Sequence, residues 1–198
     1  MDWHVYLMRI MSIAKVGKKY SQDPYALANY QELEELSLEM LNNFVVPKYS
    51  ENLFQRDIYP TPNVSVRCLV IQDDKILMVK EKDDLGWALP GGWCEIFLSP
   101  QDNAIKEVKE ETGYQIEVER LLAIYQREKY KNYPTLVSEY SLYFLASIAG
   151  GNPVNNHEVS AVDFFEFENL PNLSRKTTLK EISQAYQVYQ ENLNCYYE

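Results

Sequence analysis

The spacing of apolar residues divides the chain into a helical N-terminal part and a strand-rich remainder. Residues 1 to about 46 carry apolar side chains at helical spacing in two runs. The first run ends near Lys18-Lys19, and the second starts at Asp23-Pro24, where an aspartate cap and a proline favour a helix start. Because two amphipathic helices cannot bury their apolar faces alone, we expect them to pack on the rest of the chain or on a second subunit. Prolines then predict a linker: Pro47, Pro60 and Pro62.

From Val64 onward the pattern is typical of strands. The segments 64–71 and 76–80 flank a turn at Asp73-Asp74, and we expect them to form a hairpin. Further strands are expected at 116–119, 121–125, 140–146 and 164–167, and a last helix at about 177–193. With one helix between the two groups of strands, this order predicts an α/β domain, an α/β/α sandwich with a mixed sheet.

A cluster of glutamates is the strongest chemical signal. Glu107, Glu110 and Glu111 stand at i, i+3 and i+4, so in a helix their carboxylates share one face. Three like charges repel one another, but hard divalent cations such as Mg²⁺ bind carboxylate oxygens and offset that repulsion. A solvated surface is the commoner explanation of a glutamate-rich helix face, so the surrounding residues decide between the two.

The surrounding residues favour a metal site. A loop with a glycine pair, Gly91-Gly92, precedes the cluster, and Ser99-Pro100 supplies a helix cap with proline in the first turn. Gly113 stands where a helix C-terminal cap belongs. The apolar residues beside the carboxylates complete an amphipathic helix: Ala104, Ile105 and Val108.

This unit resembles the Nudix box, a glycine-initiated loop-helix-loop signature whose helix reads R-E-U-x-E-E-x-G-U, where U is a bulky apolar residue. The box begins here at Gly92 and ends at Gly113-Tyr114. Leu98 stands where the family has its first glutamate, and Lys106 stands where it has arginine. The run into the box, 87–91, is also similar to the family's. Matching residues are Glu107, Val108, Glu110, Glu111 and Gly113. The resemblance implies a Nudix-type α/β/α sandwich.

The N-terminal part resembles the helical extension of Nudix hydrolases that act on X-linked nucleoside diphosphates. Members of that group tend to carry an apolar residue followed by Ser-Pro where Leu98-Ser99-Pro100 stands, and a lysine at Lys106, so both departures fit a subfamily pattern. The resemblance implies an extension and linker at 1–57, a Nudix hydrolase domain at 58–198 and a homodimer through the N-terminal helices. The segments that carry this resemblance are Ile13-Ala14 with Gly17, Tyr20-Ser21 with Asp23-Pro24-Tyr25, and Tyr59–Pro62 before Val66-Arg67.

The resemblance also implies a metal-binding and catalytic set. Mg²⁺, with Mn²⁺ as an alternative, would be held by the helix glutamates, the Gly91 carbonyl and a distal carboxylate from a later loop. Glu158 is the main candidate for that carboxylate, balanced against an ordinary solvated glutamate, and Glu139 is the weaker competitor. Clustered carboxylates titrate together, so the general base stays open between Glu158 and the helix glutamates. The implied catalytic residues are Glu107, Glu110, Glu111 and Glu158, and the implied metal ligands are these four with Gly91.

Composition agrees with one domain, or with one domain plus an extension. The chain has 198 residues, with 19 Lys and Arg against 29 Asp and Glu, for a net charge of −10. This acidity disfavours nucleic acid and anionic membranes as partners. No apolar stretch predicts a membrane span or a signal peptide, so we expect a cytoplasmic protein with a small-molecule nucleotide substrate. The three cysteines, Cys68, Cys94 and Cys195, lack metal-ligand spacing. Cys94, near the glycine pair, is interpreted as a small filler residue in a reducing compartment.

The function implied is metal-dependent hydrolysis of a nucleoside diphosphate linked to another group, of the CDP-choline or ADP-ribose class, to a nucleoside monophosphate and a phosphorylated X. Two alternatives remain: a catalytically weakened Nudix-fold nucleotide-binding regulator, and an interaction protein whose acidic helix binds Ca²⁺ or Mg²⁺. Candidates for stacking on the nucleoside base, each also explained by packing, are Trp93, Phe97, Tyr130 and Tyr133. Surface or packing roles are expected for His4 and His157.

Overall fold

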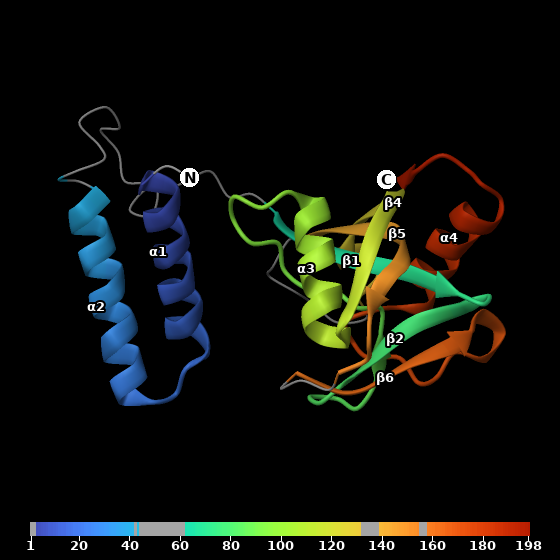
Figure 1. Ribbon diagram of the computed structural model, residues 1–198, viewed down its shortest axis with the longest axis horizontal. Coiled ribbons are helices and arrows are strands. Elements are labelled where there is room, and N and C mark those ends of the chain that lie inside the picture. The colour runs from blue at the N-terminus through green and yellow to red at the C-terminus, as the bar shows by residue number, and fades with distance from the viewer. Residues whose placement is uncertain (1–2, 42, 44–61, 132–138, 155–157) are drawn as a thin grey trace. The chain divides into compact units, whose positions relative to one another are not determined.

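The computed structural model describes residues 3–41, 43, 62–131, 139–154 and 158–198 (Figure 1). The chain divides into two compact units, Met1–Pro60 and Thr61–Glu198, which are described separately. The expected linker prolines Pro47 and Pro60 lie outside the described residues. Within the described ranges, no helix is long and apolar enough to cross a membrane.

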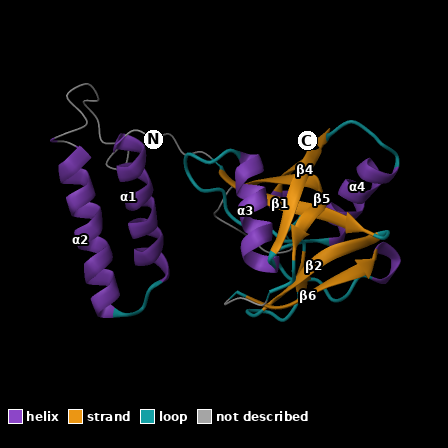
Figure 2. Cartoon of the chain, in the orientation of Figure 1, coloured by secondary structure: helices purple, strands orange, loops and turns teal. Residues whose placement is uncertain are grey.

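The N-terminal unit is a pair of helices, α1 (Trp3–Tyr20) and α2 (Pro24–Met40), as the apolar spacing predicts (Figure 2). Asp23 caps α2, because its carboxylate accepts hydrogen bonds from the backbone N–H groups of Tyr25 at 2.8 Å and Ala26 at 3.3 Å. The helices approach closely at Gly17, where a Cβ atom would lie 2.4 Å from the Tyr30 ring. Glycine therefore allows the two backbones to come together at this point.

Only part of the apolar surface of this unit is buried between α1 and α2. Leu7, Met11 and Ala14 are buried, and Lys18 links the two helices through an ion pair with Glu34 at 2.9 Å. Many large apolar side chains of the unit remain exposed: Trp3, Tyr6, Ile13, Val16, Tyr20, Tyr25, Leu33, Leu36 and Met40. Exposed apolar surface of this kind is typical of an interaction site.

The C-terminal unit contains a seven-stranded mixed sheet in the order β3-β2-β1-β5-β4-β7, with β6 paired to β2. β1 and β5 are parallel, whereas β4 pairs antiparallel with β5 and β6 pairs antiparallel with β2. The strands are β1 (Asn63–Gln72), β2 (Lys75–Glu81), β3 (Trp87–Ala88), β4 (Tyr114–Gln126), β5 (Glu139–Gly151), β6 (Val159–Glu166) and β7 (Tyr196–Tyr197). The helices are α3 (Pro100–Thr112) and α4 (Leu179–Gln190), with short 3₁₀ turns at Arg127–Lys129 and Phe167–Asn169.

The alternation of side chains along β1 creates two cores, one on each face of the sheet. Val66, Cys68 and Val70 belong to a core that includes Ala104 and Val108 of α3. The intervening Leu69 belongs to the other core, with Ile182 and Ala185 of α4. Helices therefore cover both faces, which confirms the predicted α/β/α sandwich (Figure 2).

The differences from the expected elements lie where the local pattern is weak. The segments expected as two strands at 116–119 and 121–125 form the single strand β4, whose register shifts between Val118 and Arg120. A bulge interrupts the alternation of side chains, so the sequence pattern suggests a break. β3 and β7 each have two residues, too few to produce a periodic signal. The predicted strand at 164–167 begins earlier, at Val159.

Candidate active site

The helix that carries the glutamates, α3, begins and ends where the sequence predicts. The Ser99 hydroxyl accepts a hydrogen bond from the backbone N–H of Asp102 at 3.0 Å, and Pro100 occupies the first turn. Gly113 ends the helix in a left-handed conformation with φ 81°, which glycine adopts without strain. Ala104 and Val108 are fully buried against the sheet. Glu107 and Glu111 of α3 lie beside the glycine loop.

Asn103 fixes the loop that precedes α3, a role the sequence did not indicate. Its side chain is fully buried, and its Nδ2 donates to the carbonyls of Leu98 at 3.3 Å and Ser99 at 3.0 Å. Its Oδ1 accepts from the backbone N–H of Glu95 at 2.8 Å. One side chain therefore satisfies backbone groups along 95–99 and sets the shape of this loop.

The glycine pair lies between β1 and α3. The loop runs beside β1, with the Val66 N–H donating to the Gly92 carbonyl at 2.9 Å. A Cβ on Gly91 would lie 2.2 Å from the Val66 carbonyl oxygen, and its φ of 141° also requires glycine. A Cβ on Gly92 would lie 2.5 Å from the Glu107 Oε2. Glycines at both positions thus let the backbone approach β1 on one side and a glutamate on the other.

Glu111 is buried and is bound directly to the glycine loop. Its side chain accepts a hydrogen bond from the Gly91 N–H at 2.7 Å, and the residue is 3% exposed. Burial raises the pKa of Glu111 to about 8; the charges of Glu107 and Glu81 add to this, whereas Arg67 and the Gly91 N–H oppose it. A buried carboxyl surrounded by other carboxylates is stabilised in its charged form by a cation.

Glu107 shares this environment and brings in a residue from a distant part of the chain. Burial raises the pKa of Glu107, and the charges of Glu110 and Glu158 raise it further, while Lys106 and Arg67 lower it. Glu158 is exposed, and its carbonyl accepts a hydrogen bond from the Lys82 N–H at 3.2 Å, beside the end of β2. The structure thus brings Glu158 within electrostatic range of the glutamate helix.

Glu139, the alternative distal carboxylate, lies in a different set of contacts. It is buried, and its carboxylate accepts hydrogen bonds from the Ser65 hydroxyl at 2.7 Å and Lys131 Nζ at 3.0 Å. Arg127 lies 3.9 Å from the same carboxylate. Glu139 therefore has cationic and hydroxyl partners of its own.

Glu110 differs from its two neighbours on α3, since its side chain is 57% exposed and pairs with Lys106 Nζ at 2.8 Å. Lys106 also pairs with Glu95 at 3.0 Å. The Asp102 carboxylate, four residues before Lys106, accepts a hydrogen bond from the Ser99 hydroxyl at 2.6 Å.

The carboxylates are not already gathered around one point. Among the residues that the structure describes, no three His, Cys, Asp or Glu side chains are close enough together to hold a metal ion. Glu110 and Glu111 are each directed to a partner of their own, and Arg67 Nη1 donates a hydrogen bond to the Gly91 carbonyl. The donors themselves are carboxylate and carbonyl oxygens, the type that Mg²⁺ prefers, and two of them are carboxyls whose pKa is raised. The residues present therefore fit a hard divalent cation.

The aromatic candidates separate into two groups. Trp93 and Phe97 are exposed, at 47% and 52%, in the loop between the glycine pair and α3. Tyr130 is 6% exposed, packs against Tyr125 and donates its hydroxyl to Glu198 at 2.9 Å, so its role is packing. Tyr133 and His157 lie outside the described residues, and the side chain of His4 is not described either.

Comparison with known proteins identifies the family. A model described as the NUDIX domain matches residues 61–186, which is more than half of the chain. The chain belongs to the Nudix family. It is a Nudix hydrolase, and a second model, described as the UDP-X-like N-terminal oligomerisation domain, matches residues 1–45.

Similar proteins cover nearly the whole of this Nudix hydrolase. A protein of Bacillus subtilis (strain 168) named "Putative ADP-ribose pyrophosphatase YjhB" is 37% identical over 193 residues, covering 93% of this chain and 90% of that protein. The crystal structure of a UDP-X diphosphatase has a TM-score of 0.70 at 31% identity and covers 98% of this chain and 97% of that one. An ADP-ribose pyrophosphatase structure from Streptococcus suis 89-1591 has a TM-score of 0.63 at 34% identity, and covers 70% of this chain and 100% of that one.

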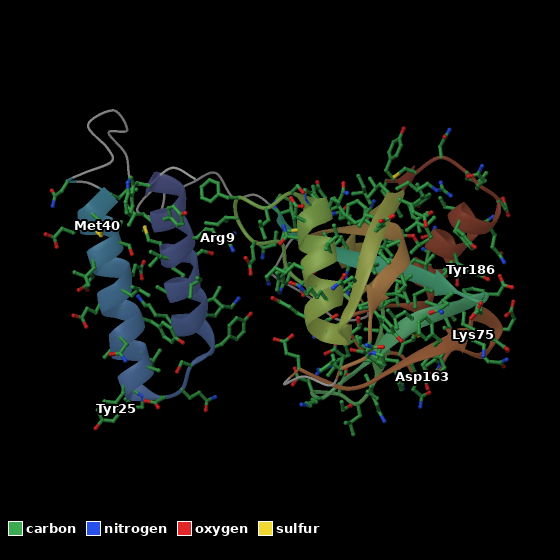
Figure 3. The ribbon with its side chains drawn as sticks, viewed as in Figure 1. Arg9, Tyr25, Met40, Lys75, Asp163 and Tyr186 are labelled. Atoms are coloured by element: carbon green, nitrogen blue, oxygen red, sulfur yellow. The ribbon has the colours of Figure 1, made fainter. Side chains whose placement is uncertain are left out.

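Two charged residues near this site were missed by sequence reasoning, Arg67 on β1 and Glu81 at the end of β2. Both are buried, at 7% and 2% exposure, inside strands that are otherwise mostly apolar. Figure 3 shows the side chains of this unit and labels Lys75, the first residue of β2. A charged residue within a buried strand rarely occurs without a partner. That signal was present in the sequence for Arg67, which stands between Val66 and Cys68, whereas Glu81 stands within the charged run 80–84.

Proposed function

We propose that this Nudix hydrolase is a metal-dependent pyrophosphohydrolase that cleaves the diphosphate of a nucleoside diphosphate linked to a second group. The products are a nucleoside monophosphate and the phosphorylated second group. The observation that carries the proposal is the buried Glu111, bonded to the Gly91 N–H and surrounded by further carboxylates. ADP-ribose and UDP-linked compounds are the first substrate classes to examine, because relatives covering most of the chain are named for them. CDP-choline is a third.

In this proposal the helix glutamates Glu107, Glu110 and Glu111, the Gly91 carbonyl and Glu158 hold Mg²⁺ or Mn²⁺. When bound, such an ion neutralises charge on the diphosphate and lowers the pKa of a water molecule.

The chain's own residues set the geometry for this chemistry. Glu111 and the Gly91 N–H hold the glycine loop against α3, and Arg67 keeps the Gly91 carbonyl in place from the other side. Glu107 and Glu158 interact electrostatically, so proton removal from water belongs to a coupled group of carboxylates and not to one assigned residue.

The test is hydrolysis of ADP-ribose, UDP-glucose and CDP-choline by the purified full chain with Mg²⁺, followed by chromatography of the nucleotide products. The proposal predicts a nucleoside monophosphate from at least one of the three. Tight binding without turnover would instead favour the regulatory alternative, to which the departures at Leu98 and Lys106 give some weight. If the chain neither binds nor hydrolyses any of the three compounds, the enzyme and the regulator are both contradicted.

Restoring the general family residues tests whether those departures mark a decayed enzyme. Lys106 is already held between Glu95 and Glu110, and an arginine would meet the same two carboxylates. A glutamate at position 98 would add a negative charge near the acidic helix. We therefore expect the double variant Leu98→Glu/Lys106→Arg to raise kcat/KM by less than about 10-fold, or about 1.4 kcal/mol. Recovery of fast hydrolysis from a nearly inactive parent would contradict this reading.

We also propose that residues 1–57 serve assembly and residues 58–198 serve catalysis. The exposed apolar side chains of α1 and α2 and the match to an oligomerisation domain support a homodimer through the N-terminal unit. Removal of residues 1–46 is expected to yield a monomer or an aggregating protein, since the remaining chain loses the surface that pairs two copies. Multi-angle light scattering measures the mass directly. A full-length chain that is monomeric at micromolar concentration would refute the dimer.

A further inference from the structure

Glu81, the last residue of β2, is a buried carboxylate with only one of its two oxygens in use. The residue is 2% exposed, and its Oε2 accepts a hydrogen bond from Lys176 Nζ at 2.7 Å. Its Oε1 is buried and has no hydrogen-bond partner among the described residues. A buried carboxylate oxygen without a partner is costly, so its retention at this position needs an explanation.

The position of Glu81 connects it to the acidic site. In the β2–β6 pairing Glu81 stands opposite Val159, the residue that follows Glu158. The N–H of Lys82, the residue after Glu81, donates a hydrogen bond to the Glu158 carbonyl at 3.2 Å. The charge of Glu81 acts on Glu111 of α3. The charge of Glu81 thus acts on α3 from β2, and the charge of Glu158 acts on α3 from the residue preceding β6.

We propose that Glu81 is a further carboxylate ligand of the divalent cation, and that Lys176 holds it in place when the cation is absent. The free Oε1 is a hard oxygen donor, the kind that Mg²⁺ and Mn²⁺ bind. Lys176, whose side chain is 42% exposed, offsets the charge of Glu81 but satisfies only Oε2. A cation shared with Glu111 would satisfy the second oxygen and relieve the repulsion between these two carboxylates. This inference rests on the metal dependence of the proposed function.

A purely structural role for Glu81 makes a different prediction. The Glu81–Lys176 pair also joins β2 to the segment that leads into α4. In the structural explanation, the pair serves only to hold these two segments together. Asp84 provides a comparable link, because its carboxylate accepts hydrogen bonds from the Ser174 hydroxyl at 3.0 Å and the Arg175 N–H at 2.9 Å. Asp84 is not among the largest contributors to the pKa shifts of Glu107 and Glu111, so it serves as a matched control.

The experiment is calorimetric titration of Mn²⁺ into the purified full chain, comparing wild type with Glu81→Gln, Lys176→Met and Asp84→Asn. We expect Glu81→Gln to weaken Mn²⁺ binding by about 10-fold or more, in the range seen for residues around metal sites. Lys176→Met should bind Mn²⁺ as tightly as wild type or more tightly, since it removes a competing cation. Asp84→Asn should leave the affinity unchanged.

The two substitutions in the Glu81–Lys176 pair separate the explanations. If the pair is only structural, Glu81→Gln and Lys176→Met change the melting temperature in EDTA alike and affect Mn²⁺ binding alike. If Glu81 binds the cation, their effects on Mn²⁺ affinity are opposite or unequal, and Mn²⁺ raises the melting temperature of Lys176→Met by at least as much as that of wild type. Affinity of Glu81→Gln equal to that of wild type would overturn the inference.

Failure of this inference is distinguishable from failure of the proposed function. Weakened Mn²⁺ binding by Glu81→Gln in a protein that hydrolyses no nucleoside diphosphate would support the ligand role and contradict the proposed activity. Mg²⁺-dependent hydrolysis with unchanged Mn²⁺ affinity in Glu81→Gln would support the activity and contradict the ligand role. A wild-type chain that binds no Mn²⁺ would overturn both.

Discussion

Glu111→Gln is expected to lower kcat/KM at least ~100-fold, on the scale of losing a major electrostatic contact in a catalytic site. Glutamine keeps the shape of the side chain and an oxygen that can accept the Gly91 N–H, but it cannot carry the negative charge that a cation requires. Glu107→Gln should show a comparable loss. Initial rates at several Mg²⁺ concentrations measure both variants, and the loss should persist at saturating Mg²⁺.

The control for this prediction is Glu117→Gln, because Glu117 is an exposed glutamate that belongs to β4 and not to α3. It removes the same charge from the chain and should retain wild-type turnover. If Glu107→Gln and Glu111→Gln also hydrolyse substrate at the wild-type rate, the assignment of the site to α3 is wrong.

The largest effect on stability is expected from the ion pair between Arg127 and Glu181. Arg127 Nη1 lies 2.8 Å from one carboxylate oxygen of Glu181 and 2.9 Å from the other. The two residues are 3% and 0% exposed, and Glu181 also accepts the Thr178 N–H at 2.9 Å in a capping box at the start of α4. Glu181→Ala should lower the free energy of unfolding by about 3–5 kcal/mol, since it leaves the guanidinium of Arg127 buried without this partner.

Urea denaturation of the full chain measures this change, with Lys129→Ala as the control. Lys129 pairs with Glu198 at 3.4 Å but is 53% exposed, so its removal should cost at most about 1 kcal/mol. The double variant Arg127→Met/Glu181→Leu should lose less free energy of unfolding than the sum of the losses of the two single variants. The reason is that it removes both buried charges together. An unchanged urea midpoint for Glu181→Ala would show that the pair contributes little.

The sequence predicts features whose signals are local. Apolar spacing and caps locate α3, and Ser99 and Gly113 bound it as expected. The turn between β1 and β2 contains Asp73 and Asp74, both with positive φ, at 50° and 59°, a conformation that aspartate tolerates better than most residues. Elements of this kind are determined by neighbouring residues, so they can be predicted without the tertiary structure.

Features that depend on long-range packing were not predicted. Equal helical spacing places Glu107, Glu110 and Glu111 on one face, but it does not indicate that Glu111 is buried on the glycine loop while Glu110 is exposed. That difference arises from the approach of Gly91 to α3. Likewise, the partner of Glu81 is Lys176, far along the chain, and spacing cannot show such a pairing.

The central claim is tested most directly by ³¹P NMR of ADP-ribose, a UDP-linked sugar and CDP-choline incubated with the full chain in water enriched in ¹⁸O. The account predicts that, with Mg²⁺, the diphosphate signals of at least one compound are replaced by two phosphomonoester signals, one of which carries ¹⁸O. With EDTA in place of Mg²⁺ the diphosphate signals should persist. Unchanged diphosphate signals for all three compounds in the presence of Mg²⁺, or equal cleavage with EDTA, would contradict a metal-dependent pyrophosphohydrolase.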